Sequence, residues 1–237
     1  MRLSFAGERI LAVMAHPDDA DLMCAGLLER ARSEGAAIGV AYLCRGDKGQ
    51  PDPPLPNLAD VRFGEAARNA GAIGATIIRG IFDDGSLVDG EPGRAFLLAA
   101  FREFRPTLVI AHPPEDYHPD HQACAQLALS VSWMSASKGF ITENLPPLTQ
   151  QPALWWCDTF GMTGFDPTLF VDVSPWGPGK VDRLASHESQ LARGPGGSSH
   201  PFAALVRHQM ESRGRESLVE YAEAYRPHQT YKRTRAW

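Results

Sequence analysis

Residues 9–19 read RILAVMAHPDD, an apolar run that ends in a histidine, a proline and two acids. The run Ile10–Ala15 contains no polar residue, which is typical of a strand buried on both faces of a parallel sheet. Pro17 stands where a following helix would begin, a position at which its missing N–H costs little. The stretch therefore predicts a buried strand that leads directly into a polar turn.

Downstream of this run, strand-like and helix-like segments alternate as far as about residue 140. The expected strands are Ala37–Leu43, Thr76–Ile78 and Thr107–Ala111, and the expected helices are Ala20–Glu34, Leu58–Ala72, Pro92–Phe104 and one that begins near Pro119. This alternation predicts an α/β, Rossmann-like fold whose mostly parallel sheet has helices on both faces and strand order 3-2-1-4.

The last hundred residues form a less regular C-terminal extension. They contain Pro-rich loops, two strand candidates (Ala153–Cys157 and Leu169–Val173) and two or three helices after Lys180. We interpret residues 1–145 as a Rossmann-like core that carries both motifs described below. Residues 146–237 are expected to belong to the same domain and to complete its sheet and its pocket.

Composition narrows the classes of protein and partner. The chain has 237 residues, 43% of them hydrophobic, which suits one domain with a full core. Its net charge of −5 and the lack of any basic run argue against nucleic acid and anionic membranes as partners. No apolar stretch is long enough for a signal-peptide core or a membrane span.

The four cysteines lack C-x-x-C spacing and sit in apolar segments. We therefore expect reduced thiols and a cytoplasmic protein. We also expect the protein to be a homo-oligomer.

A second polar segment, Asp116–His121, reads DYHPDH and follows the expected fourth strand. In a sheet ordered 3-2-1-4, strands 1 and 4 are neighbours and the chain leaves them in opposite directions. Ligands bind in the crevice at the carboxyl ends of such strands. The topology therefore brings the two polar segments, which are far apart in sequence, to one place.

The residue types in these segments suit a catalytic divalent ion. Two imidazoles and one carboxylate, with one position left open for water, form a common zinc set. His16 and Asp19 are three residues apart, as are His118 and His121, so either pair can converge over a tight turn. Asp18 and Asp19 are consecutive and cannot point the same way, so one can bind metal while the other addresses water.

A hydrolase needs that second carboxylate. A metal lowers the pKa of bound water to roughly 7, and a nearby base takes the proton as the water attacks a carbonyl. The resulting oxyanion needs a further donor, for which His118 is available, and Asp120 is a candidate to orient an imidazole. His112 also ends the fourth strand, and we interpret it as a packing or capping residue rather than as a ligand.

Taken together, the two motifs resemble the LmbE-like (PIG-L) family of zinc-dependent N-acetylglucosaminyl deacetylases. Further segments carry the same resemblance: Gly46–Gly49, Arg62–Ala66 and the late helix from Lys180 to His187–Gln190. The chain departs from the family pattern in having Cys44 where a threonine is more usual. This departure removes no catalytic group.

The resemblance implies a role for each polar residue of the motifs. It implies one zinc ion per chain on His16, Asp19 and His121, although other divalent transition metals would also fit. Asp18 would be the general base. His118 would stabilise the oxyanion or act as an acid, with Asp120 also in the catalytic set.

Substrate contacts are expected from Arg62, Asp116, Tyr117 and His187. The family removes acetyl groups from N-acetylglucosamine linked to various aglycones, so we expect an amino-sugar substrate. The alternative interpretation of Arg62 is a surface ion pair with Glu65, three residues further on.

Two rival functions remain open. One is a zinc amidohydrolase that cleaves a non-sugar N-acyl metabolite. The other, from a different class, is a non-catalytic sugar- or nucleotide-binding protein of Rossmann-like fold. The first strand leads into His-Pro-Asp-Asp instead of a Gly-rich phosphate loop, and no G-x-G-x-x-G is present, which argues against the binding protein.

Overall fold

The computed structural model describes residues 4–191 and 201–229. The strands are β1 Arg9–Met14, β2 Ala37–Tyr42, β3 Thr76–Ile78, β4 Leu108–Ala111, β5 Ala153–Cys157, β6 Leu169–Asp172 and β7 Ala222–Pro227. The helices are α1 Asp19–Met23, α2 Ala25–Ser33, α3 Leu58–Ala72, α4 Glu91–Phe104, α5 Pro119–Ser135, α6 Gly177–Arg183, α7 Glu188–Leu191 and α8 Phe202–Ser217, with a 3-10 turn at Leu184–Ser186.

All seven strands belong to one sheet with the order β3-β2-β1-β4-β5-β7-β6. The five strands from β3 to β5 are parallel, and β7 runs antiparallel to both of its neighbours. Val13 of β1 pairs with Ala111 of β4, so these two strands end side by side. The Rossmann-like fold and the order 3-2-1-4 are therefore confirmed, and the crevice between β1 and β4 lies where the topology predicts it.

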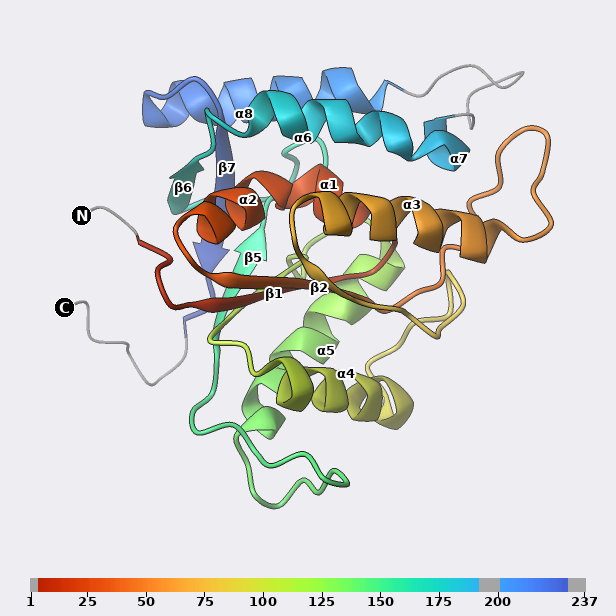
Figure 1. Cartoon of the computed structure of the whole chain (residues 1–237), viewed down its shortest axis with the longest axis vertical. Helices are drawn as coiled ribbons and strands as arrows, with labels where there is room; N and C mark the ends of the chain where they lie inside the picture. Colours follow the sequence, from red (N-terminus) through yellow and green to blue (C-terminus); the bar gives the residue numbers. More distant parts are fainter. Residues whose placement is uncertain (1–3, 192–200, 230–237) are drawn as a thin grey trace.

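Helices cover both faces of the sheet (Figure 1). Alternate residues of β1 explain this, because side chains along a strand point to opposite faces. Ile10, Ala12 and Met14 pack into a cluster with α1, α2, α6 and α8, whereas Leu11 and Val13 pack into a second cluster with α4 and α5. Both faces of the central strands are buried, which accounts for their lack of polar residues.

One expected helix is divided into two. The expected helix Ala20–Glu34 is broken at Cys24 (φ −142°, ψ 8°) into α1 and α2. The break exposes the first backbone N–H groups of α2, and the carboxylate of Glu223 accepts from Gly26 N at 2.9 Å and Leu27 N at 2.8 Å. A Cβ at position 26 would lie 2.9 Å from Glu223 Oε1, so this close approach requires glycine.

The strand that supplies this carboxylate, β7, was not predicted. Its sequence AEAYRP has a glutamate among apolar residues, which hides the alternating pattern of a strand. Glu223 is nevertheless buried, because it forms an ion pair with Lys180 at 2.6 Å and accepts from Tyr225 Oη at 2.7 Å. A buried acid thus stands where the pattern requires an apolar residue.

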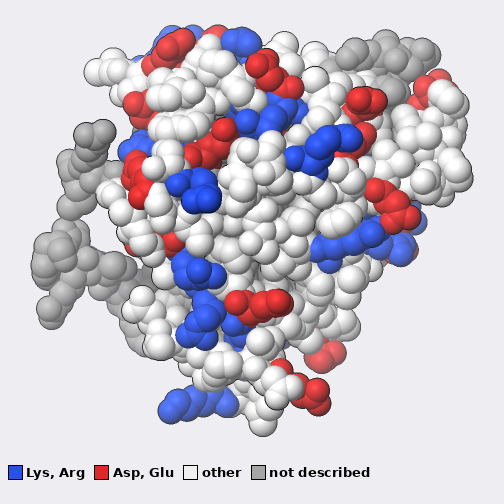
Figure 2. Space-filling view, in the orientation of Figure 1, with Lys and Arg blue, Asp and Glu red and all other residues white. Residues whose placement is uncertain are grey.

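The later part of the chain continues the sheet beyond β4 with β5, β7 and β6. The division into residues 1–145 and 146–237 stays a prediction. All four cysteines are buried and unpaired, as expected. None of the described helices is long and apolar enough to cross a membrane. On the face shown in Figure 2, basic and acidic side chains are interspersed.

Candidate metal centre

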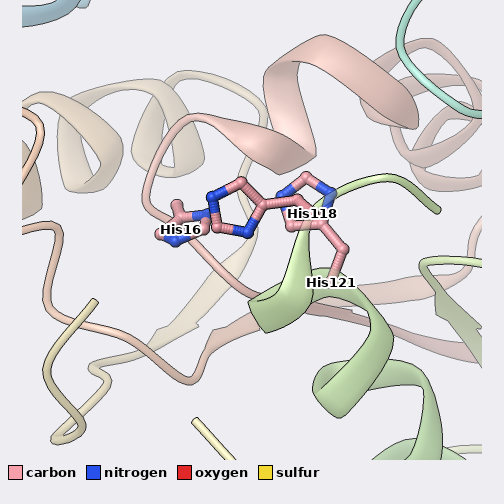
Figure 3. Close-up of side chains that lie close together, drawn as sticks. All are labelled: His16, His118 and His121. Carbon is pink, nitrogen blue, oxygen red and sulfur yellow. The ribbon is translucent and has the colours of Figure 1, made fainter. Parts of the chain in front are cut away.

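Three histidines from two distant segments meet at the carboxyl ends of β1 and β4. His16 lies two residues after the end of β1, and His118 and His121 lie at the start of α5 (Figure 3). His118 is the N-cap of α5, where its Nδ1 accepts from Asp120 N at 3.2 Å, and Pro119 occupies the first position of the helix. The turn that carries these rings is thereby held in place by local structure.

Asp19 stands between two of these rings. Its Oδ2 lies 3.5 Å from His16 Nδ1 and 3.5 Å from His121 Nε2. All three residues are buried. Two donors that share one tetrahedral ion at about 2.1 Å lie roughly 3.4 Å apart. Each of the two distances from Asp19 is thus close to the spacing of two ligands on one such ion, and the set of His16, Asp19 and His121 stays a prediction.

A second carboxylate supports each of the two rings from the opposite side. His16 Nε2 lies 3.1 Å from Asp120 Oδ2, and His121 Nδ1 lies 3.1 Å from Asp116 Oδ1. Asp120 in turn accepts from Gly85 N at 2.7 Å. Such carboxylate–histidine pairs orient metal-binding imidazoles. Asp116, an expected substrate contact, is only 2% exposed, and its carboxylate lies against the His121 ring instead of at an open surface.

The carboxylates make the centre attractive to positive charge. Burial opposes protonation of His16, but Asp120 and Asp19 outweigh it and raise the pKa of this imidazole to about 10. Burial likewise opposes protonation of His121, and Asp19 and Asp116 raise its pKa to about 9. Burial would raise the pKa of Asp19, yet His121 and His112 hold it well below the ordinary value. Protons or a metal ion can supply the charge that this cluster favours.

Metal affinity should therefore depend steeply on pH. Two imidazolium protons must leave before His16 and His121 can bind an ion, because their pKa values are about 10 and about 9. The apparent affinity for Zn²⁺ should rise by up to about 100-fold per pH unit below pH 9 and level off above pH 10. Isothermal titration calorimetry near neutral pH, in buffers of different ionisation enthalpy, should count about two protons released per ion.

The control for this experiment is His187→Gln. His187 is also buried with a raised pKa, but its Nε2 lies 2.8 Å from Asp21 Oδ2, in a different cluster. This variant should leave the proton count unchanged. Binding of Zn²⁺ to the wild-type protein without proton release would contradict the ligand assignment.

His112 belongs to the cluster more closely than the sequence suggested. It accepts from Ala15 N at 3.2 Å and stacks on His121 with ring centroids 3.8 Å apart, as a packing and capping residue should. Its Nε2 also lies 3.1 Å from Asp19 Oδ2, and Asp19, His112 and His121 offer donor atoms within 4.8 Å of one another. The available signal was its position at the end of the strand that adjoins β1.

His118 differs from the other rings in its hydrogen bonding. It is half-buried, and its ring nitrogens come within 4.8 Å of those of His16 and His121. Burial and the two neighbouring imidazoles lower its pKa, so the ring is neutral near pH 7. Because Nδ1 accepts from Asp120 N, the proton of the neutral ring lies on Nε2. His118 therefore presents an N–H donor.

Asp18, the free carboxylate, is held by Arg62. Arg62 Nη2 donates to Asp18 Oδ1 at 2.7 Å, and both side chains are buried. Gly46 allows this arrangement, because its φ is +76° and a Cβ there would lie 2.9 Å from Arg62 Cδ. The alternative of a surface ion pair with Glu65 is wrong, since Glu65 accepts from the backbone and hydroxyl of Ser189.

The remaining two expected substrate contacts lie in different environments. Tyr117 is 73% exposed, and its ring centroid is 5.9 Å from that of His118 and 6.2 Å from that of His121. It therefore borders the open side of the histidine cluster. His187 is 2% exposed and contacts Asp21 and Asn69, so the structure does not bring it to the cluster.

Comparison with known proteins gives one family and several relatives. A family model described as PIG-L, GlcNAc-PI de-N-acetylase, matches residues 11–132, a range that includes both motifs. The 1D-myo-inositol 2-acetamido-2-deoxy-alpha-D-glucopyranoside deacetylase of Mycobacteroides abscessus is 28% identical over 84% of this chain and 87% of its own length.

Two solved structures extend the likeness to almost the whole chain. The conserved protein TT1542 of Thermus thermophilus is 27% identical, with a TM-score of 0.78 over 97% of this chain and 100% of that one. The N,N'-diacetylchitobiose deacetylase of Pyrococcus horikoshii has a TM-score of 0.82 at 22% identity, over 93% of this chain and 84% of that one, which shows a shared fold.

Proposed function

We propose, from the premise that this chain belongs to the PIG-L family, that it is a metal-dependent hydrolase that removes an acetyl group from an N-acetylglucosamine-type amino sugar. One observation carries the proposal. Asp19 lies between His16 and His121 at metal-ligand spacing, while the adjacent Asp18 turns to Arg62 and remains outside that set.

One zinc-type ion would be held by His16, Asp19 and His121. Two imidazoles and a carboxylate suit zinc, and the supporting carboxylates Asp120 and Asp116 add the outer contacts that such sites need. When bound, the ion supplies Lewis acidity that polarises the amide carbonyl and acidifies water.

Asp18 is proposed as the general base. It takes a proton from water as the water oxygen attacks the amide carbon. The ion pair with Arg62 keeps this carboxylate in one orientation, so that the base does not swing into the ligand set of its neighbour Asp19. The C–N bond then breaks, the amine nitrogen takes the proton that Asp18 accepted, and acetate and a free amine leave.

His118 is proposed to stabilise the carbonyl oxygen as its negative charge develops. The neutral ring carries its proton on Nε2. This N–H can donate a hydrogen bond to the oxyanion as it forms, which lowers the energy of the transition state. Asp120 contributes twice, since its backbone N–H sets the tautomer of His118 and its carboxylate holds His16.

The sugar class of the substrate rests on the relatives. The proteins from Mycobacteroides abscessus and Pyrococcus horikoshii are named as deacetylases of an inositol-linked amino sugar and of diacetylchitobiose. Tyr117 offers an exposed ring beside His118 on which a sugar can stack. Contacts of the substrate with Arg62, Asp116 and His187 stay predictions, as do the cytoplasmic location and the homo-oligomer.

A screen for released amine tests this function. The metal-loaded protein should deacetylate N-acetylglucosamine, its glycosides or chitobiose, and a preferred aglycone should emerge as the fastest substrate. N-acetyl amino acids serve as matched amides that lack the sugar, and they should react far more slowly. Faster release from the amino acids would favour the non-sugar amidohydrolase. Release from neither class would contradict the proposal.

A further inference from the structure

A second group of side chains with metal-binding donor atoms lies on the side of His16 that faces away from Asp19. Cys44 follows β2, and its Sγ, a ring nitrogen of His16 and a carboxylate oxygen of Asp120 all lie within 4.8 Å of one another. The three side chains are buried, with exposed fractions of 1% for Cys44, 8% for His16 and 1% for Asp120. The His16 nitrogen nearest to Asp120 is Nε2, at 3.1 Å, which faces away from Asp19.

The thiol of Cys44 is not used elsewhere in the described structure. The Cys124 thiol donates to Val13 O at 3.4 Å, but among residues 4–191 and 201–229 no hydrogen bond of the Cys44 thiol is found. A buried sulfur without a partner thus lies beside an imidazole nitrogen and a carboxylate oxygen. Sulfur, nitrogen and oxygen donors in one buried group are a ligand set for a transition metal.

The spacing allows an ion to replace protons in this group. Donors about 2.0–2.3 Å from a tetrahedral ion lie roughly 3.3–3.6 Å apart. His16 Nε2 and Asp120 Oδ2 are 3.1 Å apart, and Cys44 Sγ lies within 4.8 Å of a donor atom of each, so a small approach of the sulfur would complete the set. We propose that Cys44, His16 and Asp120 form a second metal site that is selective for thiophilic ions such as Cd²⁺. This second site competes for His16 with the first site, formed by His16, Asp19 and His121.

Competition follows from the chemistry of the imidazole. A neutral ring has one lone pair, so it can bind through Nδ1 or through Nε2 but not through both at once. With the lone pair on Nδ1, His16 serves the site of Asp19 and donates from Nε2 to Asp120. With the lone pair on Nε2, it serves the site of Cys44, and the proton on Nδ1 faces Asp19 at 3.5 Å.

Both modes release two protons per ion, so the type of ligand atom distinguishes them. At the second site the ion replaces the proton on the Cys44 sulfur and the proton on His16 Nε2, and both pass to solvent. The ion itself keeps its oxidation state. Thiolate is a soft ligand, whereas the first site has nitrogen and oxygen donors alone, so soft ions should prefer the second site and Zn²⁺ the first. This inference concerns metal selectivity and does not depend on the proposed reaction.

Cadmium binding to the full-length, metal-free protein tests the site. A cadmium–thiolate bond gives a charge-transfer band in the ultraviolet, which nitrogen and oxygen ligands do not give. The band should reach its maximum at one Cd²⁺ per chain in the wild type and in Cys124→Ser, the matched control for a buried thiol outside the cluster. It should be absent in Cys44→Ser and in Cys44→Thr.

Metal exchange provides a second readout. Cd²⁺ should displace bound Zn²⁺ from the wild-type protein at least about ten times more effectively than from Cys44→Thr, because His16 cannot serve both ions. Absence of the band in the wild type would overturn the proposal without reference to any variant. A band that persists in the folded Cys44 variants would also overturn it, as would a wild type that binds Zn²⁺ and Cd²⁺ together at His16.

Discussion

Asp18→Asn is expected to lower kcat by roughly 10²–10⁴-fold while the protein keeps its metal ion. The amide oxygen of asparagine can still accept from Arg62 Nη2, which lies 2.7 Å from Asp18 Oδ1 in the wild type, so the local structure is retained. What is lost is the ability to take a proton from water. Steady-state kinetics of amine release and elemental analysis of the same preparation measure the two effects separately.

The matched variant is Asp19→Asn, one residue further along the chain. Asp19 Oδ2 lies 3.5 Å from both His16 Nδ1 and His121 Nε2, so its loss of charge should weaken metal binding first and activity as a consequence. If Asp18→Asn lost the metal and Asp19→Asn retained it, the two carboxylates would have the opposite roles.

Replacing His16, Asp19 or His121 by alanine should have the largest effect on the metal. Each substitution removes one of the three proposed protein donors, all of them buried, and activity should fall together with occupancy. The loss of affinity should exceed the roughly 10–100-fold change that accompanies removal of a supporting partner. Dialysis against a chelator of known affinity, followed by elemental analysis, gives the comparison.

Asp116→Asn and Asp120→Asn are the controls for that series. These carboxylates lie 3.1 Å from His121 Nδ1 and His16 Nε2, on the sides of the rings that face away from Asp19. Both variants should keep a weakened site and some activity. Full occupancy in all three alanine variants would rule out the ligand set.

The sequence predicted the position of the histidine cluster because topology follows from short-range patterns. Ile10–Ala15 and Leu108–Ala111 are apolar enough to be read as buried parallel strands, and the alternation with helices predicts which of them are neighbours. Once β1 and β4 adjoin, the residues that follow them must converge. The convergence of His16, Asp19 and His121 is a consequence of the strand order.

Partners within the site were harder to predict, because they depend on contacts between distant side chains. Arg62 and Asp18 are 44 residues apart, and no local pattern distinguishes this pair from a helical pair of Arg62 with Glu65. His112 shows the same difficulty. A histidine at the end of a strand can cap, pack or bind, and only the position of Asp19 reveals that it does more than pack.

The missed strand β7 and the break at Cys24 meet at one contact. Glu223 lies 196 residues from Leu27 in sequence, yet its carboxylate satisfies the first N–H groups of α2. Local patterns favour one continuous helix over Ala20–Glu34 and no strand around Glu223. Both features involve a contact between residues far apart in sequence, which local patterns do not reveal.

The most direct test of the central claim is to follow amine release from an N-acetylglucosamine conjugate while Zn²⁺ is added to metal-free protein. The account predicts no turnover without metal and a rise to full activity at one ion per chain, with Asp18→Asn binding the same single ion but remaining nearly inactive. Turnover by the metal-free protein at the rate of the loaded one would contradict it.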